Sequence, residues 1–246
     1  MKYLTTEELK KDQKNYADKF LSNLAGKNVR YGLALNLFKE WSKKQSWTKE
    51  MKILDLGAAG GFFTNQLYDE GYHNIYAMDV DEYIPIEPKS KLKEFKTADL
   101  NIDKLPWPDS QFDLVTAWCI LPHLENPFHC AREVSRILKP GSIFMFSALH
   151  LTSKASIDYL LKYGYFGSYR ETNNHISLLP TSVVKKTIGK DFDLIDTDYL
   201  IIPKIFRGWR GKIRQQILKF SKKYPGLEKR LKERWGYNIV YVLKKK

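Results

Sequence analysis

The segment from Asp55 to Gly61 has the residue types that bind a small polar ligand. It reads Asp-Leu-Gly-Ala-Ala-Gly-Gly, follows an apolar run from Met51 to Leu56, and precedes a helical pattern that begins near Phe62. Glycines let a turn adopt positive φ and let its backbone approach a ligand closely, while a helix N-terminus offers unpaired N–H groups. This arrangement predicts a small-molecule site at the carboxyl end of the first strand.

An acidic side chain, Asp79, ends the next apolar run, which starts at Asn74. A carboxylate at the end of a second parallel strand can accept hydrogen bonds from both ribose hydroxyls of an adenosine. Asp81 is the nearby competitor, and we favour Asp79. Because a nicotinamide dinucleotide would use the same carboxylate, Asp79 predicts an adenosyl ligand without selecting the cofactor.

The spacing of the loop resembles a known motif. Asp55, Gly57, Ala59 and Gly61 form Asp-x-Gly-x-Ala-x-Gly, which is similar to motif I of class I S-adenosylmethionine (SAM)-dependent methyltransferases, with Ala59 in place of the usual middle glycine. Further matching stretches follow at 97–100 and 105–115. The stretch 137–144 looks like the segment that leads into the fifth strand of small-molecule and lipid methyltransferases. The resemblance covers residues 51–148.

This resemblance implies a Rossmann-like sheet that binds SAM and releases S-adenosylhomocysteine. It also implies that Asp99 takes the adenine amino group, that Leu100 contacts the ring edge, and that Trp118 faces the methionine moiety. The alternative roles are a turn cap for Asp99 and core packing for Trp118. The sequence departs from the family between the second and third strands, where Pro85 and Pro88 leave only a loop or a single turn in place of a helix.

Methyl transfer from a sulfonium chiefly requires alignment, because the methyl group is already a strong electrophile. The protein must align the acceptor with the sulfur–methyl bond and exclude water. A hydroxyl acceptor also benefits from a general base, which contributes roughly 10² to 10⁴-fold. Three histidines are candidates for that base or for acceptor contact: His123 after the fourth strand, His150 after the fifth, and His175 in an irregular region. His123 is the first choice, and its alternative role is to orient its own loop.

A parallel sheet would bring these residues together, and the hydrophobic pattern predicts one. Short apolar runs alternate with helical segments, which is typical of strands that are buried on both faces. The predicted class is α/β, a Rossmann-like seven-stranded mostly parallel sheet with helices on both faces. The predicted strands are 51–56, 74–78, 95–98, 112–119, 142–147, 192–202 and 237–243.

Helical signals flank these strands. Thr5 or Thr6 with Glu8 marks a first N-terminal helix, and 29–42 is a second one. The other predicted helices are 126–138, capped by Asn126 and stopped at Pro140-Gly141, then 153–163 and 181–188. With 246 residues and 43% hydrophobic content, the chain can bury one core. We divide it into an N-terminal helical cap, 1–48, a SAM-binding core, 49–150, and an acceptor-side region, 151–246, with a basic helical insertion at about 204–235.

The net charge of +13 is confined to the C-terminal region. Residues 201–246 contain 15 Lys or Arg against two Glu, so the first 200 residues are neutral overall. From Ile205 to Tyr224, apolar residues recur mostly at three- or four-residue steps with basic residues between them, which predicts an amphipathic helix. Such a helix suits an anionic membrane surface, a phosphorylated substrate or RNA. It could also be a lid packed over the acceptor or a merely solvated basic face.

The remaining composition bears on metals and compartment. Cys119 and Cys130 form no CxxC pair, and no second ligand pair accompanies Cys119 and His123, so neither a disulfide framework nor a metal site is supported. The first residues lack the apolar run of a secretory signal, and no stretch reaches the roughly 18 apolar residues of a membrane span. We expect a soluble cytoplasmic protein, and peripheral attachment to the inner membrane face stays open.

The acceptor is indicated only by the end of the chain. Residues 235–242 resemble the closing strand of bacterial methyltransferases that act on glycan or lipid-linked intermediates. Together with the basic helix, this favours a small-molecule, sugar or lipid-linked acceptor. An RNA methyltransferase is the main competing function, because Trp209, Tyr224 and Trp235 could stack on bases. A catalytically silent SAM-binding partner protein and a nicotinamide oxidoreductase are two further competing functions.

Overall fold

The computed structural model describes residues 5, 7–8, 10–11, 14 and 29–246. Its strands are β1 (Ile53–Leu56), β2 (Ile75–Asp79), β3 (Glu94–Thr97), β4 (Phe112–Trp118), β5 (Leu138–Leu149), β6 (Phe192–Leu200) and β7 (Asn238–Lys245). Its helices are α2 (Val29–Lys44), α3 (Phe62–Asp69), α4 (Ile86–Ser90), α5 (Pro127–Ile137), α6 (Lys154–Tyr163), α7 (Thr181–Thr187), α8 (Gly208–Ser221) and α9 (Pro225–Trp235). Short 3-10 turns are η2 (Leu121–His123), η3 (Ile188–Lys190) and η4 (Pro203–Phe206).

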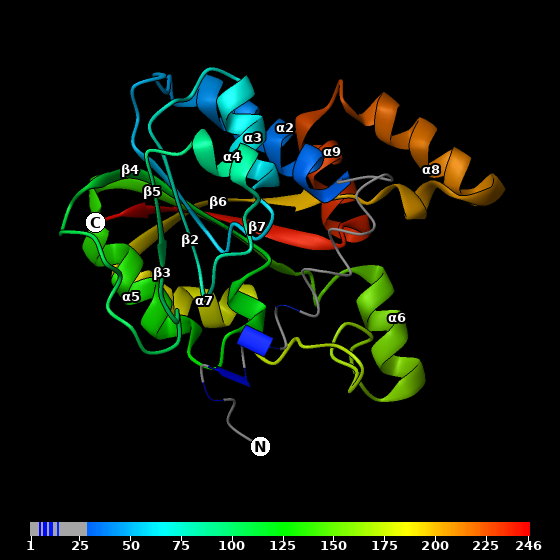
Figure 1. The fold of residues 1–246 in the computed structure, drawn as a ribbon. Coiled ribbons are helices and arrows are strands. Elements are labelled where there is room, and N and C mark those ends of the chain that lie inside the picture. Colours follow the sequence, from blue (N-terminus) through cyan, green and yellow to red (C-terminus); the bar gives the residue numbers. More distant parts are fainter. Residues whose placement is uncertain (1–4, 6, 9, 12–13, 15–28) are drawn as a thin grey trace.

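The seven strands form a sheet in the order β3-β2-β1-β4-β5-β7-β6 (Figure 1). The first five strands are parallel, and β7 runs antiparallel between β5 and β6. The chain runs from β1 through β2 to β3 on one side of β1 and then crosses to β4 on the other side. The boundary between β1 and β4 is therefore a topological switch point. Ligands of open α/β sheets bind outside the carboxyl ends of the strands at such a point.

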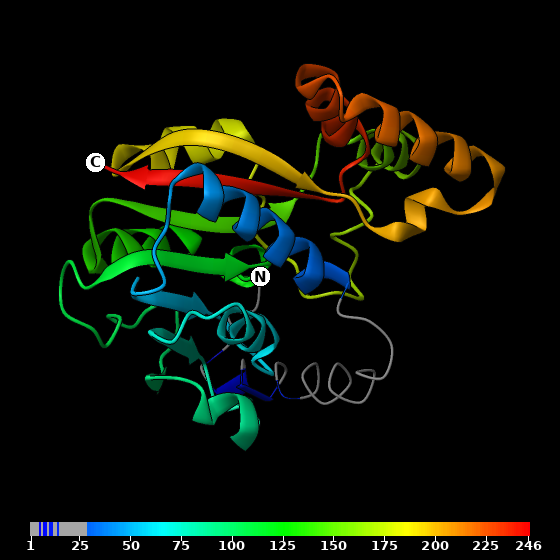
Figure 2. The ribbon, with the colours of Figure 1, turned by 90° about the horizontal axis from the view of Figure 1, so that it is seen from above.

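Helices cover both faces of the sheet, as Figures 1 and 2 show. On one face α2 and α3 pack through an aromatic cluster that includes Phe38, Phe63 and Tyr72. On the other face α5 and α7 contribute Val134 and Val184 to a second apolar core. The central strands are therefore buried on both faces, which explains why they are nearly continuous apolar runs in the sequence. The predicted α/β fold class is confirmed.

The link between β2 and β3 contains only the five-residue helix α4, a single helical turn as expected from its prolines. Helix α5 begins as predicted, because the side chain of Asn126 accepts a hydrogen bond from the backbone N–H of His129 at 3.0 Å. It ends at Ile137, and the predicted stop at Pro140-Gly141 lies inside β5, which begins four residues earlier than the sequence indicated. At the N-terminus, Thr5 and Glu8 form the expected reciprocal cap, while Thr6 lies outside the described residues.

The basic insertion leaves and re-enters the sheet at one place, since Leu200 of β6 and Asn238 of β7 are register partners. The expected helix over 205–224 is α8 preceded by the turn η4, and Pro225 starts a separate helix, α9. Helix α9 lies along β6, where Lys229 pairs with Asp196 at 2.5 Å. Helix α8 projects away from the body (Figures 1 and 2). Among the described helices, none is long and apolar enough to cross a membrane.

Candidate functional site

The loop after β1 has the left-handed backbone that its sequence predicts. Gly57 and Gly61 have φ values of 69° and 73°, and Ala59 has a φ of 45°. A Cβ atom on Gly57 would overlap the side chain of Ile120, so position 57 requires glycine for space as well as for conformation. The backbone N–H groups of Gly57 and Ala58 donate to the carbonyl of Met78, which ties the loop to β2.

Asp79 ends β2 and faces this loop. Its Oδ2 accepts from the N–H of Ala59 at 2.9 Å, and its Oδ1 accepts from the N–H of Val80 at 2.8 Å. Burial raises the pKa of the Asp79 carboxyl to about 6. The two hydrogen bonds lower this pKa, and the charge of Asp81 raises it. Each carboxylate oxygen keeps a further lone pair, so Asp79 can accept two ribose hydroxyls without breaking its bonds to the backbone.

Asp55 lies directly beneath the loop. Its Oδ1 accepts a hydrogen bond from Thr116 Oγ1 at 2.7 Å, which links β1 to β4. Burial raises the pKa of the Asp55 carboxyl to about 7; the Thr116 bond lowers it and the charge of Asp79 raises it further. Burial is the main cause of both raised pKa values, and the two carboxyl groups beside one loop favour a cationic ligand, because a positive charge stabilises their ionised forms.

The single turn between β2 and β3 packs beside the loop after β1. Ile84 and Pro88 are buried, and a Cβ on Gly61 would lie 2.7 Å from Ile84 Cδ1 and 2.8 Å from Pro88 Cβ. The N-terminal segment also reaches this end of the sheet, because the hydroxyl of Tyr83 donates to the carbonyl of Lys10 at 3.0 Å. Sequence reasoning missed Tyr83, which stands in the proline-containing link.

Asp99 and Leu100 follow β3 and are both buried. Asp99 Oδ1 accepts from the backbone N–H and the side-chain amide of Asn101, both at 2.9 Å. The N–H of Asp99 donates to Asp103 Oδ2 at 2.8 Å. These bonds make Asp99 a turn cap. Its contact with adenine stays a prediction. Leu100 packs in the core on the α5 side of the sheet.

Trp118 ends β4 at the switch point. The indole is 7% exposed and packs edge-on against Phe63 of α3, with ring centroids 5.1 Å apart. Among the described residues, its Nε1 is one of three buried side-chain polar atoms with no hydrogen-bond partner. A buried donor without a partner is costly, so this indole both packs in the core and can donate to a ligand.

Two of the three candidate histidines meet beyond the end of β4. The rings of His123 in η2 and His175 stack with centroids 4.4 Å apart and an angle of 29° between them. His123 Nδ1 faces the carbonyl of Asn174 at 3.0 Å, and His175 Nδ1 faces the carbonyl of Ser168 at 2.8 Å. Because a carbonyl only accepts, each neutral ring carries its proton on Nδ1 and its lone pair on Nε2.

A comparison with known families matches the part of the chain that contains the loop after β1 and Asp79. The model of a family described as a methyltransferase domain matches residues 54–146, from β1 through most of β5. The chain carries a methyltransferase domain. The expected SAM-dependent methyltransferase class is thereby confirmed for this part of the chain, and the loop after β1, Asp79 and Trp118 all lie within it.

Similar proteins agree with the domain and differ in what their names say they act on. The ubiquinone biosynthesis O-methyltransferase of Pseudomonas aeruginosa is 26% identical over 125 residues, which are 47% of this chain and 51% of that protein. The tRNA U34 carboxymethyltransferase of Saccharophagus degradans is 25% identical over 131 residues, which are 47% of this chain and 40% of that protein. The chain thus spans about half the length of these curated relatives or less.

Solved structures share the fold over most of the chain. The S-adenosylmethionine-dependent methyltransferase of Mesorhizobium loti superposes with a TM-score of 0.52 at 17% identity, covering 84% of this chain and 97% of that one. At this level of identity the likeness shows the fold alone. It agrees with the Rossmann-like architecture around the methyltransferase domain.

His150 lies apart from the other two histidines. Its ring is 3% exposed, its Nδ1 faces the carbonyl of Gly236 at 3.3 Å, and its Nε2 lies 3.1 Å from Thr152 Oγ1. Burial lowers the pKa of His150, so the ring is neutral at pH 7. The ring joins the end of β5 to the start of β7, and its predicted contact with an acceptor stays a prediction.

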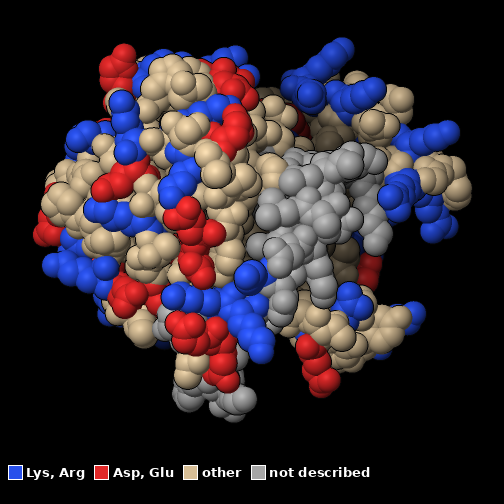
Figure 3. Space-filling view, in the orientation of Figure 1, with Lys and Arg blue, Asp and Glu red and all other residues tan. Residues whose placement is uncertain are grey.

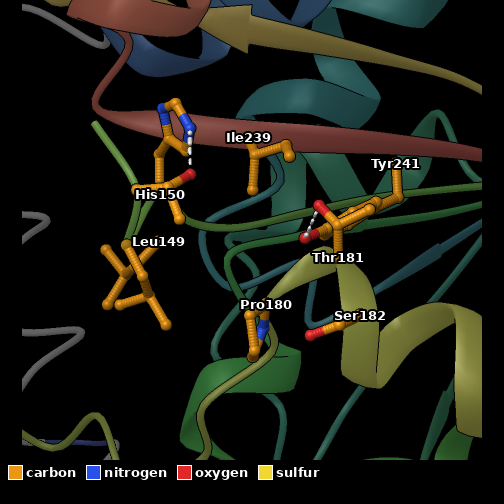
Figure 4. Close-up of a pocket in the computed structure, with 9 residues that line it drawn as sticks. Leu149, His150, Pro180, Thr181, Ser182, Ile239 and Tyr241 are labelled. Atoms are coloured by element: carbon orange, nitrogen blue, oxygen red, sulfur yellow. Dashed lines mark hydrogen bonds between the residues drawn. The ribbon is translucent and has the colours of Figure 1, made fainter.

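His150 also lines a cavity of about 230 Å³ at the end of β5 (Figure 4). In Figure 4 its imidazole turns away from Pro180 and Thr181 on the far side of the cavity. The polar groups there are the hydroxyls of Thr181 and Tyr241, which are 3.2 Å apart. Burial raises the pKa of Tyr241 to about 12, so this hydroxyl stays protonated, and it donates its hydrogen bond to the carbonyl of Leu179 at 2.9 Å.

A cluster that sequence reasoning missed lies beside Trp118, at the end of β4. Cys119 has a φ of 60°, and its N–H donates to Ser147 Oγ at 2.9 Å. Its Sγ accepts from Asn238 Nδ2 at 3.3 Å. The only available signal was a cysteine directly after an apolar strand, because Ser147 and Asn238 are ordinary strand residues in the sequence. Within the described residues there is no group of three or more His, Cys, Asp or Glu that could hold a metal ion.

Proposed function

We propose that this chain transfers the methyl group of SAM by direct displacement to a small-molecule acceptor, in particular a sugar or a lipid-linked molecule. The observation that carries the proposal is the pair formed by Asp79 and the Ala59 N–H, 2.9 Å apart, at the carboxyl ends of β1 and β2. In this pair, a carboxylate that can accept hydrogen bonds from a ribose lies beside a backbone that can approach a ligand closely. SAM itself supplies a methyl group on a positively charged sulfur.

The residues present fit such a cofactor. Asp79 would hold the ribose hydroxyls, the loop 57–61 would lie along the ligand, and Asp99 with Leu100 would border the adenine. Trp118 would face the methionine moiety and could donate from its buried Nε1. The carboxylates of Asp55 and Asp79 also favour a cation, because a positive charge lowers their raised pKa values.

For a hydroxyl acceptor, we assign the general base to His123. The Asn174 carbonyl accepts from Nδ1 at 3.0 Å and orients the ring, and an imidazole is the side chain most often used as a general base. His175 stacks on the same ring and would orient it or contact the acceptor. His150 keeps the candidate role of shaping the acceptor side next to the cavity at the end of β5.

The acceptor class rests on two features of different kinds. One relative is named for ubiquinone biosynthesis, which indicates that this type of domain can serve a lipid-forming reaction. The basic insertion carries nearly all of the net charge, and it favours an anionic surface such as the inner face of a membrane. A lipid-linked acceptor would be met at that surface.

Isothermal titration of the purified protein with SAM, S-adenosylhomocysteine and NAD tests the cofactor. We expect both adenosyl-sulfur ligands to bind, NAD not to bind, and Asp79→Ala to weaken binding by about 100-fold, since a carboxylate with two hydroxyl partners is lost. Asp81→Ala is the matched control and should bind as the wild type does, because Asp81 is an exposed neighbour. Binding of NAD, or equal loss in both variants, would refute the proposal.

An RNA acceptor is the second candidate, favoured by one relative named as a tRNA-modifying enzyme. Transfer of labelled methyl groups to lipid, glycan and RNA fractions of a cell extract separates the candidates. Label in the RNA fraction that persists at moderate salt would support the second candidate, since nonspecific attraction weakens steeply with salt. No label in any fraction with a SAM-binding protein would instead support a catalytically silent partner.

A further inference from the structure

We propose that α8 is a docking helix that binds the surface of an anionic lipid membrane. The inference deepens the proposed function, because it gives the lipid-linked acceptor a place to be met. Its test needs neither SAM nor acceptor, so the two proposals can fail separately.

An apolar stripe runs along the exposed side of α8. Trp209, Ile213, Ile217 and Phe220 follow one another at steps of four, four and three residues, which places them on one helical face. Their exposed fractions are 68%, 49%, 41% and 59%. Tyr224 extends the stripe just beyond the helix and is 53% exposed. Five neighbouring large apolar side chains in contact with solvent require an explanation, because soluble proteins seldom leave such a row uncovered.

Basic side chains border the stripe on both sides. Lys212 and Lys219 lie along one border, and Arg210 lies along the other, as follows from a turn of about 100° per residue. No Asp or Glu occurs in α8. Figure 3 shows blue and tan side chains, with hardly any red, over this projecting part of the molecule. An apolar stripe between two basic borders is the arrangement of helices that lie in a membrane interface.

The opposite side of α8 packs on the turn η4, so the stripe is not its packing face. Gly211 and Ser221 are buried, and a Cβ on Gly211 would overlap the backbone of Phe206 in η4. Arg214 donates to the carbonyl of Ile205 at 3.4 Å. The stripe therefore does not form a closed lid against the described part of the enzyme. Figure 2 shows α8 beyond the carboxyl ends of β4 and β5, where an acceptor would enter.

A lipid surface fits these residues better than RNA does. Two of the four stripe residues within α8, Ile213 and Ile217, are aliphatic and cannot stack on bases, while all four can enter the boundary between headgroups and acyl chains. The charge on the borders complements anionic headgroups, which hold the helix while the stripe inserts. Insertion also predicts that part of the binding survives at a salt concentration that screens the charges.

Vesicle flotation with the full-length protein tests the inference. We expect binding to vesicles of phosphatidylcholine and phosphatidylglycerol, and at least tenfold weaker binding to phosphatidylcholine alone. The double variant Trp209→Ser/Phe220→Ser should bind at least tenfold more weakly, and Lys212→Glu/Lys219→Glu should lose the preference for the anionic lipid. Because all four side chains are exposed, the variants should fold and keep the affinity for SAM of the wild type.

Two matched controls isolate α8. Ile86→Ser removes an apolar side chain that is 89% exposed elsewhere, and Lys185→Glu/Lys186→Glu reverses two exposed charges on α7. Both should bind vesicles as the wild type does. Equal binding by the stripe variant and the wild type would overturn the inference. A wild type that does not bind vesicles would also overturn it. This holds even if the stripe variants lose RNA binding in a gel shift or self-association in light scattering.

Discussion

At the scale of single residues, Asp55 combines a structural cost with a functional use. It is 3% exposed and its carboxyl pKa is raised from 3.8 to about 7 by burial. The difference corresponds to a cost on the order of 4 kcal/mol for ionising Asp55 in the folded chain. Because the folded pKa is the higher one, this cost is absent below the unfolded pKa and grows as the pH rises toward about 7.

Asp55→Asn should therefore stabilise the protein at high pH and weaken its cofactor site. Asparagine keeps an Oδ1 acceptor for Thr116 and removes the buried charge, so we expect a gain of about 2–4 kcal/mol at pH 8 and almost none at pH 4. Denaturant unfolding of wild type and variant at both pH values measures this. The variant should also bind SAM more weakly, because a charge that favours the cation is gone. A gain of equal size at pH 4 would assign the effect to packing instead.

The sequence indicated the loop after β1 and the carboxylate at the end of β2 more clearly than it indicated the residues around them. Asp79 and the loop 57–61 stand at strand ends in local motifs, and the structure places them against each other. Thr116, Ser147 and Asn238 gave no such signal, because they are small polar residues within strands. Their contacts with Asp55 and Cys119 depend on the register of four strands, which a local pattern does not contain.

At the scale of elements, the loop before α7 is held over η2 by a few identifiable bonds. The N–H groups of Ile176 and Ser177 both donate to the carbonyl of Pro122, and Ser177 Oγ donates to the carbonyl of Leu124 at 2.5 Å. This attachment brings His175 onto His123, two residues that are far apart in the sequence. The predicted irregular region gave no reason to expect the pairing, because loop docking is decided by tertiary contacts.

Ser177→Ala should loosen this attachment without affecting the cofactor side. We expect the amides of Ile176 and Ser177 to exchange with solvent about fivefold faster, because a side-chain hydrogen bond of roughly 1 kcal/mol is lost. Hydrogen exchange followed by mass spectrometry measures this over residues 164–180. Ser182→Ala, an exposed serine at the start of α7, is the control and should leave the exchange unchanged. Unchanged exchange in Ser177→Ala would show that the two backbone bonds to Pro122 hold the loop by themselves.

Element boundaries were predicted well for the central strands and for the start of α5, but not at the end of that helix. The central strands were found from their apolar runs, and Asn126 with Pro127 correctly started α5. Pro140 and Gly141 read as a helix stop, but the helix ends earlier, at Ile137, and both residues stand in the exposed first part of β5. Pro225 divides the basic insertion into α8 and α9, because proline at the first turn of a helix favours a new start.

At the scale of the whole molecule, charge and topology separate two parts of the chain. The formal net charge of +13 resides in residues 201–246, while the first 200 residues are neutral overall. The sheet closes without the insertion, since Leu200 and Asn238 face each other in adjacent strands. No residue of α9 is fully buried, and its ion pairs with β6 are partly exposed. Such pairs contribute little to stability.

This separation predicts that the insertion can be removed. Replacing residues 203–235 with a short Gly/Ser linker deletes 12 Lys or Arg and two Glu and lowers the formal net charge to +3. We expect a folded protein, destabilised by about 1–3 kcal/mol through lost packing on β6, with an affinity for SAM within about threefold of the wild type. Binding to anionic vesicles should disappear. Circular dichroism, SAM titration and flotation measure the three outcomes. A folded variant that no longer binds SAM would mean that the insertion belongs to the cofactor site rather than to a separate docking part.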